Sequence, residues 1–261
     1  MYPYIDIGSV RIGSYGVCAA VGFFVAWRVF RADLIRRNLP GRLGGIIVVS
    51  VTLTGLAGAK ALFLLETPAA LRQGILHGLL QSSGLAWLGG LLAGTGALCF
   101  LSLSYKLPLL TLFDMAAPIG AVVYAFGRIG CLLAGDGDYG KPTTMPWGMT
   151  FPHGIVPVFE PVHPTPIYEA LFSAALFCLL WKLGSELRPR GMVAGIYLFL
   201  SGAARFLVEF IRLNPPRFLG LTDAQLLSLM SIIAGAVLIV CVRLKAGDWT
   251  PIRPVDSTTS L

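Results

Sequence analysis

Seven apolar stretches of helical length alternate with short polar segments along the chain. They cover residues 13–30, 44–65, 84–104, 109–133, 167–182, 191–211 and 222–243. A helix that crosses a bilayer needs about 20 mostly apolar residues, and its backbone must satisfy its own hydrogen bonds where it meets lipid. The pattern predicts an all-α integral membrane protein with about seven transmembrane helices. Because no internal repeat is visible and no soluble domain fits in the remaining segments, we expect residues 1–261 to form one polytopic domain.

The composition agrees with this interpretation. Of the 261 residues, 56% are hydrophobic and only 13% are charged, whereas a soluble domain has about 25% charged residues. A soluble enzyme and a disordered chain are therefore excluded. The five cysteines contain no Cys-x-x-Cys pair and indicate neither a zinc site nor a disulfide framework. The chain begins without a basic segment or a cleavage site, so we expect the first apolar stretch to remain as a helix.

The basic residues predict an orientation in the membrane. Segment 28–42 contains five arginines, and lysine and arginine are enriched in cytoplasmic loops. Alternation of the spans then places the basic residues near 106, 182–190 and 243–253 on the same side. The N-terminus is predicted outside and the C-terminus inside, with an ordered outward loop at about 134–166 between spans four and five. The net charge of +7 does not indicate nucleic-acid binding, because these charges lie mostly in short loops.

Three cations fall inside apolar stretches, namely Lys60, Arg128 and Arg205. A cation at the centre of a transmembrane helix costs about 2.5–3.5 kcal/mol on insertion scales. Each of the three lies five or six residues before the predicted outer end of its span, a depth of roughly 8 Å. Their common depth predicts one anion-binding site near the outer headgroups. Two alternatives remain: Arg205, Glu209 and Arg212 form a structural ion-pair ladder, or Lys60 extends to the interface.

Three sequence blocks carry a family resemblance. Residues 127–140 read GRIGCLLAGDGDYG, residues 162–170 read VHPTPIYEA, and residues 205–212 read RFLVEFIR. In this order and spacing they resemble the prolipoprotein diacylglyceryl transferases, which are seven-span enzymes of the bacterial inner membrane. The resemblance extends to segments 15–16, 58–60 and 89–91 and covers most of the chain.

The resemblance implies an activity and its substrates. Enzymes of this family move the diacylglyceryl group of phosphatidylglycerol to the lipobox cysteine thiol of a preprolipoprotein and release glycerol phosphate. The expected partners are therefore phosphatidylglycerol, a lipobox segment and membrane lipids, with no cofactor and no nucleic acid. The expected location is the bacterial cell inner membrane, with several passes through it.

The chain departs from the family pattern at several positions. Cys131, Ala134 and Asp136 stand at its Asn, Asn and Glu positions, Leu88 at the position of a proposed catalytic histidine, and Ser201 at that of a tyrosine. The arginines of the pattern remain. These departures leave open a paralogue with the same phospholipid site but a different acceptor or chemistry. A transporter or channel for an anionic lipid or solute is the alternative from another class.

The predicted catalytic residues are Arg128, Arg205 and His163. Arginine binds phosphate oxygens through two parallel hydrogen bonds and keeps its charge when desolvated, so two arginines can hold the donor and stabilise the departing phosphate. His163 is the preferred base for the acceptor thiol, because imidazole exchanges protons near neutral pH. An alternative is that His163 only braces a helix that begins with Thr165 as N-cap.

The predicted substrate-binding residues are polar or small and lie in or near the motif blocks. They are Tyr15, Lys60, Arg128, Gly130, Asp136, Gly140, Glu169, Ser201, Arg205 and Glu209. Segment 135–140 lacks the ligand set of a calcium loop, so no metal is predicted. Asp114 shares a helix face with Arg128 but lies 14 residues earlier, and its role stays open between structure and function.

The loop charges lead to a topology prediction. We expect a C-terminal reporter that works only in the cytoplasm to be active, and one that works only outside the membrane to be silent. Fusions at both ends of the chain test this, because the two termini are predicted on opposite sides. A C-terminal reporter active only outside would overturn the orientation and the common depth of the three cations.

Overall fold

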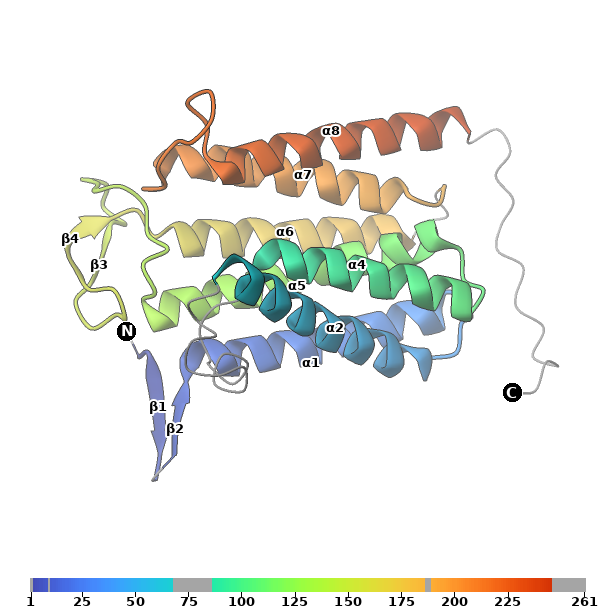
Figure 1. Ribbon diagram of the computed structural model, residues 1–261, viewed down its shortest axis with the longest axis horizontal. Coiled ribbons are helices and arrows are strands. Elements are labelled where there is room, and N and C mark those ends of the chain that lie inside the picture. The colour runs from blue at the N-terminus through green and yellow to red at the C-terminus, as the bar shows by residue number, and fades with distance from the viewer. Residues whose placement is uncertain (1, 9, 68–85, 186–188, 246–261) are drawn as a thin grey trace. The chain divides into compact units, whose positions relative to one another are not determined.

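The computed structural model describes residues 2–8, 10–67, 86–185 and 189–245. Each predicted stretch is confirmed as a helix there, although the start of the third stretch, 84–85, lies outside the described residues. The long helices are α1 (Ser14–Arg36), α2 (Leu43–Glu66), α4 (Trp87–Ser104), α5 (Leu109–Ala134), α6 (Thr165–Ser185), α7 (Met192–Val208) and α8 (Asp223–Leu244), and a 3-10 turn, η2 (Glu209–Ile211), follows α7 (Figure 1).

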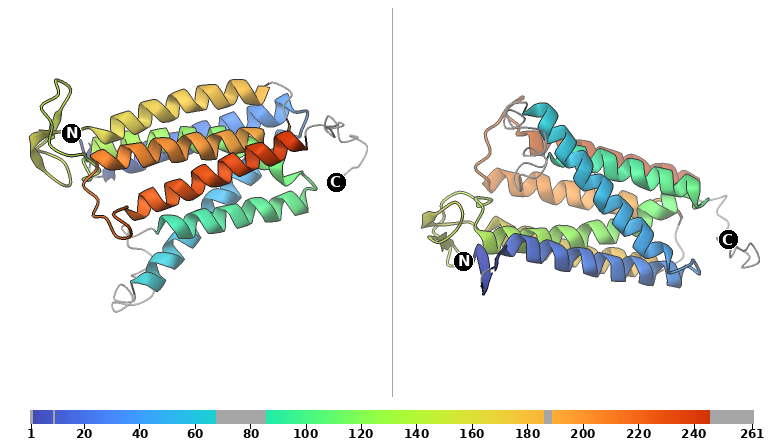
Figure 2. Two further views of the ribbon diagram at one scale, coloured as in Figure 1. Left: turned by 90° about the horizontal axis from the view of Figure 1, so that it is seen from above. Right: turned by 60° about the horizontal axis from the view of Figure 1, so that its bottom comes forward.

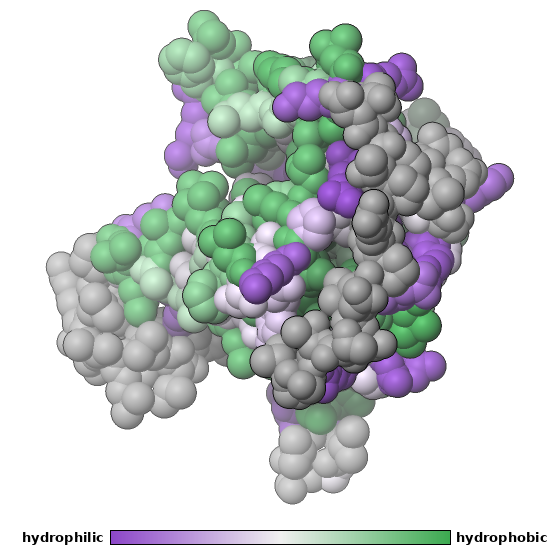
Figure 3. Space-filling model, turned by 90° about the vertical axis from the view of Figure 1, so that its right-hand side faces the viewer, coloured by the Kyte–Doolittle hydropathy of each residue, from purple (hydrophilic) through white to green (hydrophobic). Residues whose placement is uncertain are grey.

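Within the described residues, six helices are long and apolar enough to cross a membrane: α2, α4, α5, α6, α7 with η2, and α8. The remaining long helix, α1, corresponds to the first predicted span and carries charged residues from Arg28 onward. Large apolar side chains of these helices reach the surface, among them Leu53, Phe100 and Ile233. Green areas of this kind lie among hydrophilic ones on the face shown in Figure 3. Exposed apolar side chains on long helices are the arrangement expected of a protein that contacts lipid.

Two small antiparallel sheets were not predicted. Strands β1 (Tyr4–Ile7) and β2 (Val10–Gly13) form a hairpin, and β3 (Met149–Phe151) pairs with β4 (Val158–Val162). These strands have three to five residues, too few to stand out beside apolar stretches of helical length. The long elements are all helices, so the structure agrees with the predicted all-α membrane fold, and the two small sheets are additions to it.

The β3–β4 sheet orders the loop between α5 and α6. Tyr139, Phe151 and Val162 form a small buried cluster there, and the rings of Tyr139 and Phe151 stack with their centroids 3.9 Å apart. The prediction of an ordered loop at this point is confirmed. Its position outside the membrane stays a prediction.

The contacts divide the chain into two compact units, Met1–Phe30 with Phe113–Leu261, and Arg31–Leu112. In the first unit α7 lies beside both α6 and α8 (Figures 1 and 2). Glycine makes the α7–α8 contact possible, because a Cβ at Gly235 would come 2.5 Å from the backbone nitrogen of Phe199. Small residues let membrane helices approach closely in this way. In the second unit α2 packs against α4.

Asp114 has a structural role at the start of α7. Its side chain is buried, and its carboxylate oxygens accept hydrogen bonds from the backbone nitrogens of Gly191 at 2.6 Å and Ala194 at 2.8 Å. The first amide groups of a helix have no partner within the helix and carry a partial positive charge. Asp114 of α5 therefore caps α7 and ties the two helices together.

We expect Asp114→Ala to destabilise the protein by at least about 1–2 kcal/mol, the usual cost of losing a helix cap. Asp114→Asn keeps one carbonyl acceptor and should cost less. Thermal unfolding of both variants in the same detergent measures the difference. Equal unfolding temperatures for Asp114→Ala and the wild type would contradict the capping role.

Candidate active site

Three arginines converge on one carboxylate, that of Glu169 on α6. Its side chain is only 5% exposed. Arg128 of α5 reaches Oε2 with its Nε at 3.3 Å, and Arg212, directly after η2, reaches the same oxygen with Nη1 at 3.2 Å. Arg205 of α7 reaches Oε1 with Nη1 at 3.3 Å. Residues from three helices are thus joined at a single buried charge.

Two further carboxylates complete the group. Asp138 pairs with both Arg128 and Arg212. Glu209 lies 2.9 Å from Nη2 of Arg205 and 3.9 Å from Nε of Arg212. We call the six residues Arg128, Arg205, Arg212, Asp138, Glu169 and Glu209 the arginine–carboxylate cluster. Its three positive and three negative charges give a formal net charge of zero.

Neutral polar groups also hold Glu209 in place. Its Oε1 accepts hydrogen bonds from the Thr222 hydroxyl at 2.9 Å and from the Asn214 amide at 2.6 Å. The ion-pair ladder of Arg205, Glu209 and Arg212, one of the alternatives that the sequence left open, is therefore present. It does not stand alone, because both arginines also contact Glu169.

The loop after α5 brings Asp138 to the cluster. Gly135 and Gly137 have φ angles of +63° and +94°, a region that glycine adopts without the strain of a side chain. The Thr165 hydroxyl donates a hydrogen bond to the backbone oxygen of Asp138 at 2.6 Å, and the backbone nitrogen of Asp138 donates to Asp136 at 3.2 Å. The chain therefore turns back immediately after α5, and Asp138 faces the arginine on that helix.

The cluster controls the ionisation of Asp138. Burial acts to raise the pKa of this carboxyl, but the charges of Arg212 and Arg128 and their hydrogen bonds outweigh it and lower the pKa below its ordinary value. Asp138 is consequently ionised at neutral pH. Its side chain is 34% exposed, against 5% for Glu169 and 0% for Glu209, so it is the most accessible carboxylate of the cluster.

The structure brings together four of the predicted site residues: Arg128, Arg205, Glu169 and Glu209. Asp136 accepts a hydrogen bond from the backbone of Asp138, and the ion pair with Arg128 is formed by Asp138. The carboxylate predicted at this motif position is therefore two residues from the one that pairs with the arginine. The glycine turns explain the difference, because they set which side chain points back at α5.

His163 makes its side-chain contact outside the arginine–carboxylate cluster. Its Nδ1 lies 3.2 Å from the hydroxyl of Tyr168, and its backbone oxygen accepts from the nitrogen of Gly140 at 2.9 Å. A Cβ at Gly140 would come 2.8 Å from the backbone oxygen of Ile211, so this glycine permits close packing of the loop. Helix α6 includes Thr165 as its first residue, two residues before the predicted stretch 167–182 begins.

The other predicted residues contact their own helix or a neighbouring helix. The Ser201 hydroxyl donates to the backbone oxygen of Tyr197 at 2.6 Å within α7. Gly130 of α5 lies against Tyr15 of α1, where an added Cβ would be 3.0 Å from the ring. Lys60 is buried on α2 in the second unit, with its Nζ 5.4 Å from the centre of the Phe63 ring.

Three residues of the site were missed from the sequence: Asp138, Arg212 as a site residue, and Tyr124. Tyr124 of α5 donates a hydrogen bond to Oε1 of Glu169, and its ring centre lies 4.8 Å from the guanidinium carbon of Arg128. A signal for Tyr124 was present, since it precedes Arg128 by one helical turn. A tyrosine in an apolar helix nevertheless looks like an ordinary core residue.

One group of potential metal ligands occurs among the described residues. Ligand atoms of Cys131, Asp136 and Asp138 lie within 4.8 Å of one another. Both oxygens of Asp138 already pair with arginines, and these positive charges oppose a cation. The group therefore gives no reason to assign a metal.

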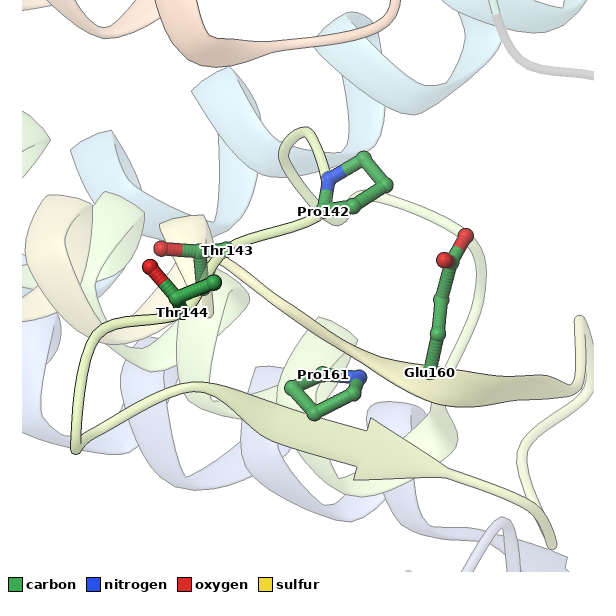
Figure 4. A pocket seen from close by; sticks show the side chains of 5 residues that line it. All are labelled: Pro142, Thr143, Thr144, Glu160 and Pro161. Carbon is green, nitrogen blue, oxygen red and sulfur yellow. The ribbon is translucent and has the colours of Figure 1, made fainter.

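A shallow depression on the loop between α5 and α6 lies apart from this chemistry. Figure 4 shows Pro142, Thr143 and Thr144 on one side of it and Glu160 and Pro161 on the other. None of these residues belongs to the arginine–carboxylate cluster.

The long apolar helices and the cluster define a multi-pass membrane protein with a charge-balanced polar site where α5 ends and α6 begins. A family model described as prolipoprotein diacylglyceryl transferase matches residues 3–241. This chain belongs to that family.

Named relatives agree over almost their whole length. A phosphatidylglycerol–prolipoprotein diacylglyceryl transferase from Marinomonas sp. (strain MWYL1) is 32% identical, with 92% of this chain and 93% of the relative covered. One from Bordetella parapertussis is 33% identical over 90% and 94%. A phosphatidylglycerol–prolipoprotein diacylglyceryl transferase 2 from Clostridium perfringens is 30% identical over 94% and 96%.

The lowered pKa of Asp138 leads to a prediction about pH. Its ion pairs stabilise the fold above the ordinary aspartate pKa of about 3.9 and are lost as the pH falls through the lower pKa of the folded protein. The difference in unfolding temperature between wild type and Asp138→Asn should therefore be constant from about pH 7 to about pH 5 and should narrow below about pH 4.

Thermal unfolding in one detergent across this pH range checks the prediction. Asp6→Asn is the matched control, because the Asp6–Arg11 pair is exposed on both sides and exposed pairs contribute little. A difference that widens in acid would contradict the ionised, paired state of Asp138.

Proposed function

We propose that this chain transfers the diacylglyceryl group of phosphatidylglycerol to the cysteine thiol of a prolipoprotein. The sulfur forms a thioether bond to the glyceryl carbon, the bond from that carbon to the phosphate oxygen breaks, and glycerol phosphate leaves with the electron pair. The observation that carries the proposal is the convergence of Arg128, Arg205 and Arg212 around Glu169. Family membership and the names of the relatives support the same reaction.

The arginines are suited to the phosphodiester of the donor. Arg128 and Arg205 keep side-chain exposures of 14% and 25%. A guanidinium group has five N–H donors, more than the carboxylate contacts of either residue use. The remaining donors bind phosphate oxygens of phosphatidylglycerol and stabilise the charge that develops on the departing phosphate.

We keep His163 as the proposed base for the acceptor thiol. The Tyr168 hydroxyl near its Nδ1 also accepts a hydrogen bond from Trp147 at 2.8 Å. To take a proton on Nε2, the neutral ring must carry its hydrogen on Nδ1 and donate it to Tyr168. Tyr168 is placed to accept this hydrogen and so to hold the ring in the tautomer that the reaction needs.

The proposed setting is the bacterial inner membrane. All seven long helices, α1 included, cross it, with the N-terminus outside and the C-terminus inside. The loop between α5 and α6 then faces outward, which places the arginine–carboxylate cluster near the outer headgroups. Phosphatidylglycerol reaches the cluster from the outer leaflet, and a lipobox segment approaches from the same side.

The test is direct synthesis. Purified protein is incubated with phosphatidylglycerol and a lipobox peptide, and mass spectrometry detects the diacylglyceryl thioether while glycerol phosphate is assayed in parallel. Failure of the folded wild-type protein to form the thioether would refute the proposed function.

We expect Arg128→Ala to lower turnover by about 100-fold or more, the scale of losing a donor that stabilises developing charge. Arg128→Lys should restore little, because an ammonium group lacks the planar two-point geometry. Arg217→Ala is the matched control, since Arg217 and its partner Asp223 are exposed. Near-normal turnover in a folded Arg128→Ala variant would remove the phosphate-binding role.

A further inference from the structure

Tyr124 contacts two members of the arginine–carboxylate cluster. Its hydroxyl donates to Oε1 of Glu169, and its ring lies against Arg128, with the guanidinium carbon 4.8 Å from the ring centre. Tyr124 and Arg128 are four residues apart on α5, so they share one helix face. One face of one helix therefore supplies both a neutral and a charged partner to the same carboxylate.

The contacts of Glu169 are evenly divided between its oxygens. Oε1 receives Tyr124 and Arg205, and Oε2 receives Arg128 and Arg212. Tyr124 and Arg205 donate hydrogen bonds to Oε1 and Arg212 donates one to Oε2, while Arg128 contacts Oε2 as an ion pair. A carboxylate oxygen has about two acceptor positions, so the two donors fill those of Oε1. Of the four partners of Glu169, three are arginines and Tyr124 is the uncharged one.

The uncharged partner matters because Arg128 and Arg205 must also bind the phosphate of the donor. A buried carboxylate oxygen with an unused acceptor position attracts any donor within reach. Without the Tyr124 hydroxyl, the nearest donor to Oε1 is Arg205, already at 3.3 Å. Arg205 would then turn further toward Glu169 and present fewer N–H groups to a phosphate.

We propose that Tyr124 is a positioning residue for donor binding. Its hydroxyl fills one acceptor position of Glu169 and its ring supports Arg128, so that Arg128 and Arg205 stay oriented toward the donor phosphate. This inference rests on the proposed function and assigns Tyr124 no contact with the substrates. It predicts an effect on the affinity for the donor and none on the affinity for the acceptor.

The test compares Tyr124→Phe with wild type in the thioether assay. We expect the KM for phosphatidylglycerol to rise about tenfold, the scale of one hydrogen bond to a charged group, while the KM for the lipobox peptide stays unchanged. Incorporation of 3-fluorotyrosine at position 124 keeps the hydroxyl donor and should restore the KM for phosphatidylglycerol. A purely structural role would lower the amount of active protein and leave both KM values as they are.

Tyr197→Phe is the matched control. Tyr197 packs in the apolar cluster of α5, α6 and α7 around Ala117 and Leu180, and its hydroxyl lies close to Gly120. We expect this variant to keep both KM values, and Tyr124→Phe to unfold at a temperature close to that of Tyr197→Phe.

Three results would overturn the inference. They are an unchanged KM for phosphatidylglycerol in Tyr124→Phe, an equal rise for both substrates, and failure of Tyr124→Phe to fold, which would make the residue structural. An active wild type with any of these results refutes only the role of Tyr124. An inactive wild type refutes the proposed function itself.

Discussion

The pairing of three arginines with three carboxylates, most of them buried or half-buried, is the constraint on which the site depends. A charge placed away from water is costly unless it is paired, and removing one partner leaves the other unpaired at a cost of several kcal/mol. Glu169 meets this requirement by contacting all three arginines. The end of α5, the end of α7 and the segment after η2 must therefore converge on the start of α6 for these charges to be paired.

The same requirement separates two kinds of buried acid in this chain. Asp114 is satisfied by backbone amide groups at the start of α7 and so fixes one helix against another. Glu169 is satisfied almost entirely by side chains that carry charge. Backbone donors cannot move without unfolding the helix, whereas arginine side chains can reorient. The contacts of Asp114 therefore stabilise the packing of two helices, and those of Glu169 are suited to a site that binds an anionic ligand.

The sequence predicted the helices well because lipid leaves the backbone few choices. Apolar length gave their bounds to within three residues, except that α1 continues through a charged segment to Arg36, six residues beyond the predicted stretch. It also predicted that Arg128 and Arg205 lie at one site, because cations in apolar stretches are conspicuous, and both belong to the arginine–carboxylate cluster. Asp138 was not predictable, since its direction depends on positive φ angles at Gly135 and Gly137. Tyr124 was missed because only the fold shows that its hydroxyl meets Glu169 rather than a backbone group.

The hairpin of β1 and β2 has a mechanical consequence. Strand β2 ends at Gly13 and α1 begins at Ser14, so no flexible residue separates them. The hairpin runs across the direction of α1 rather than along it (Figure 1). The backbone nitrogen of Tyr2 is also tied to the backbone oxygen of Leu133 on α5 at 3.2 Å. The hairpin is therefore joined to two helices, which limits how far α1 and α5 can slide past each other.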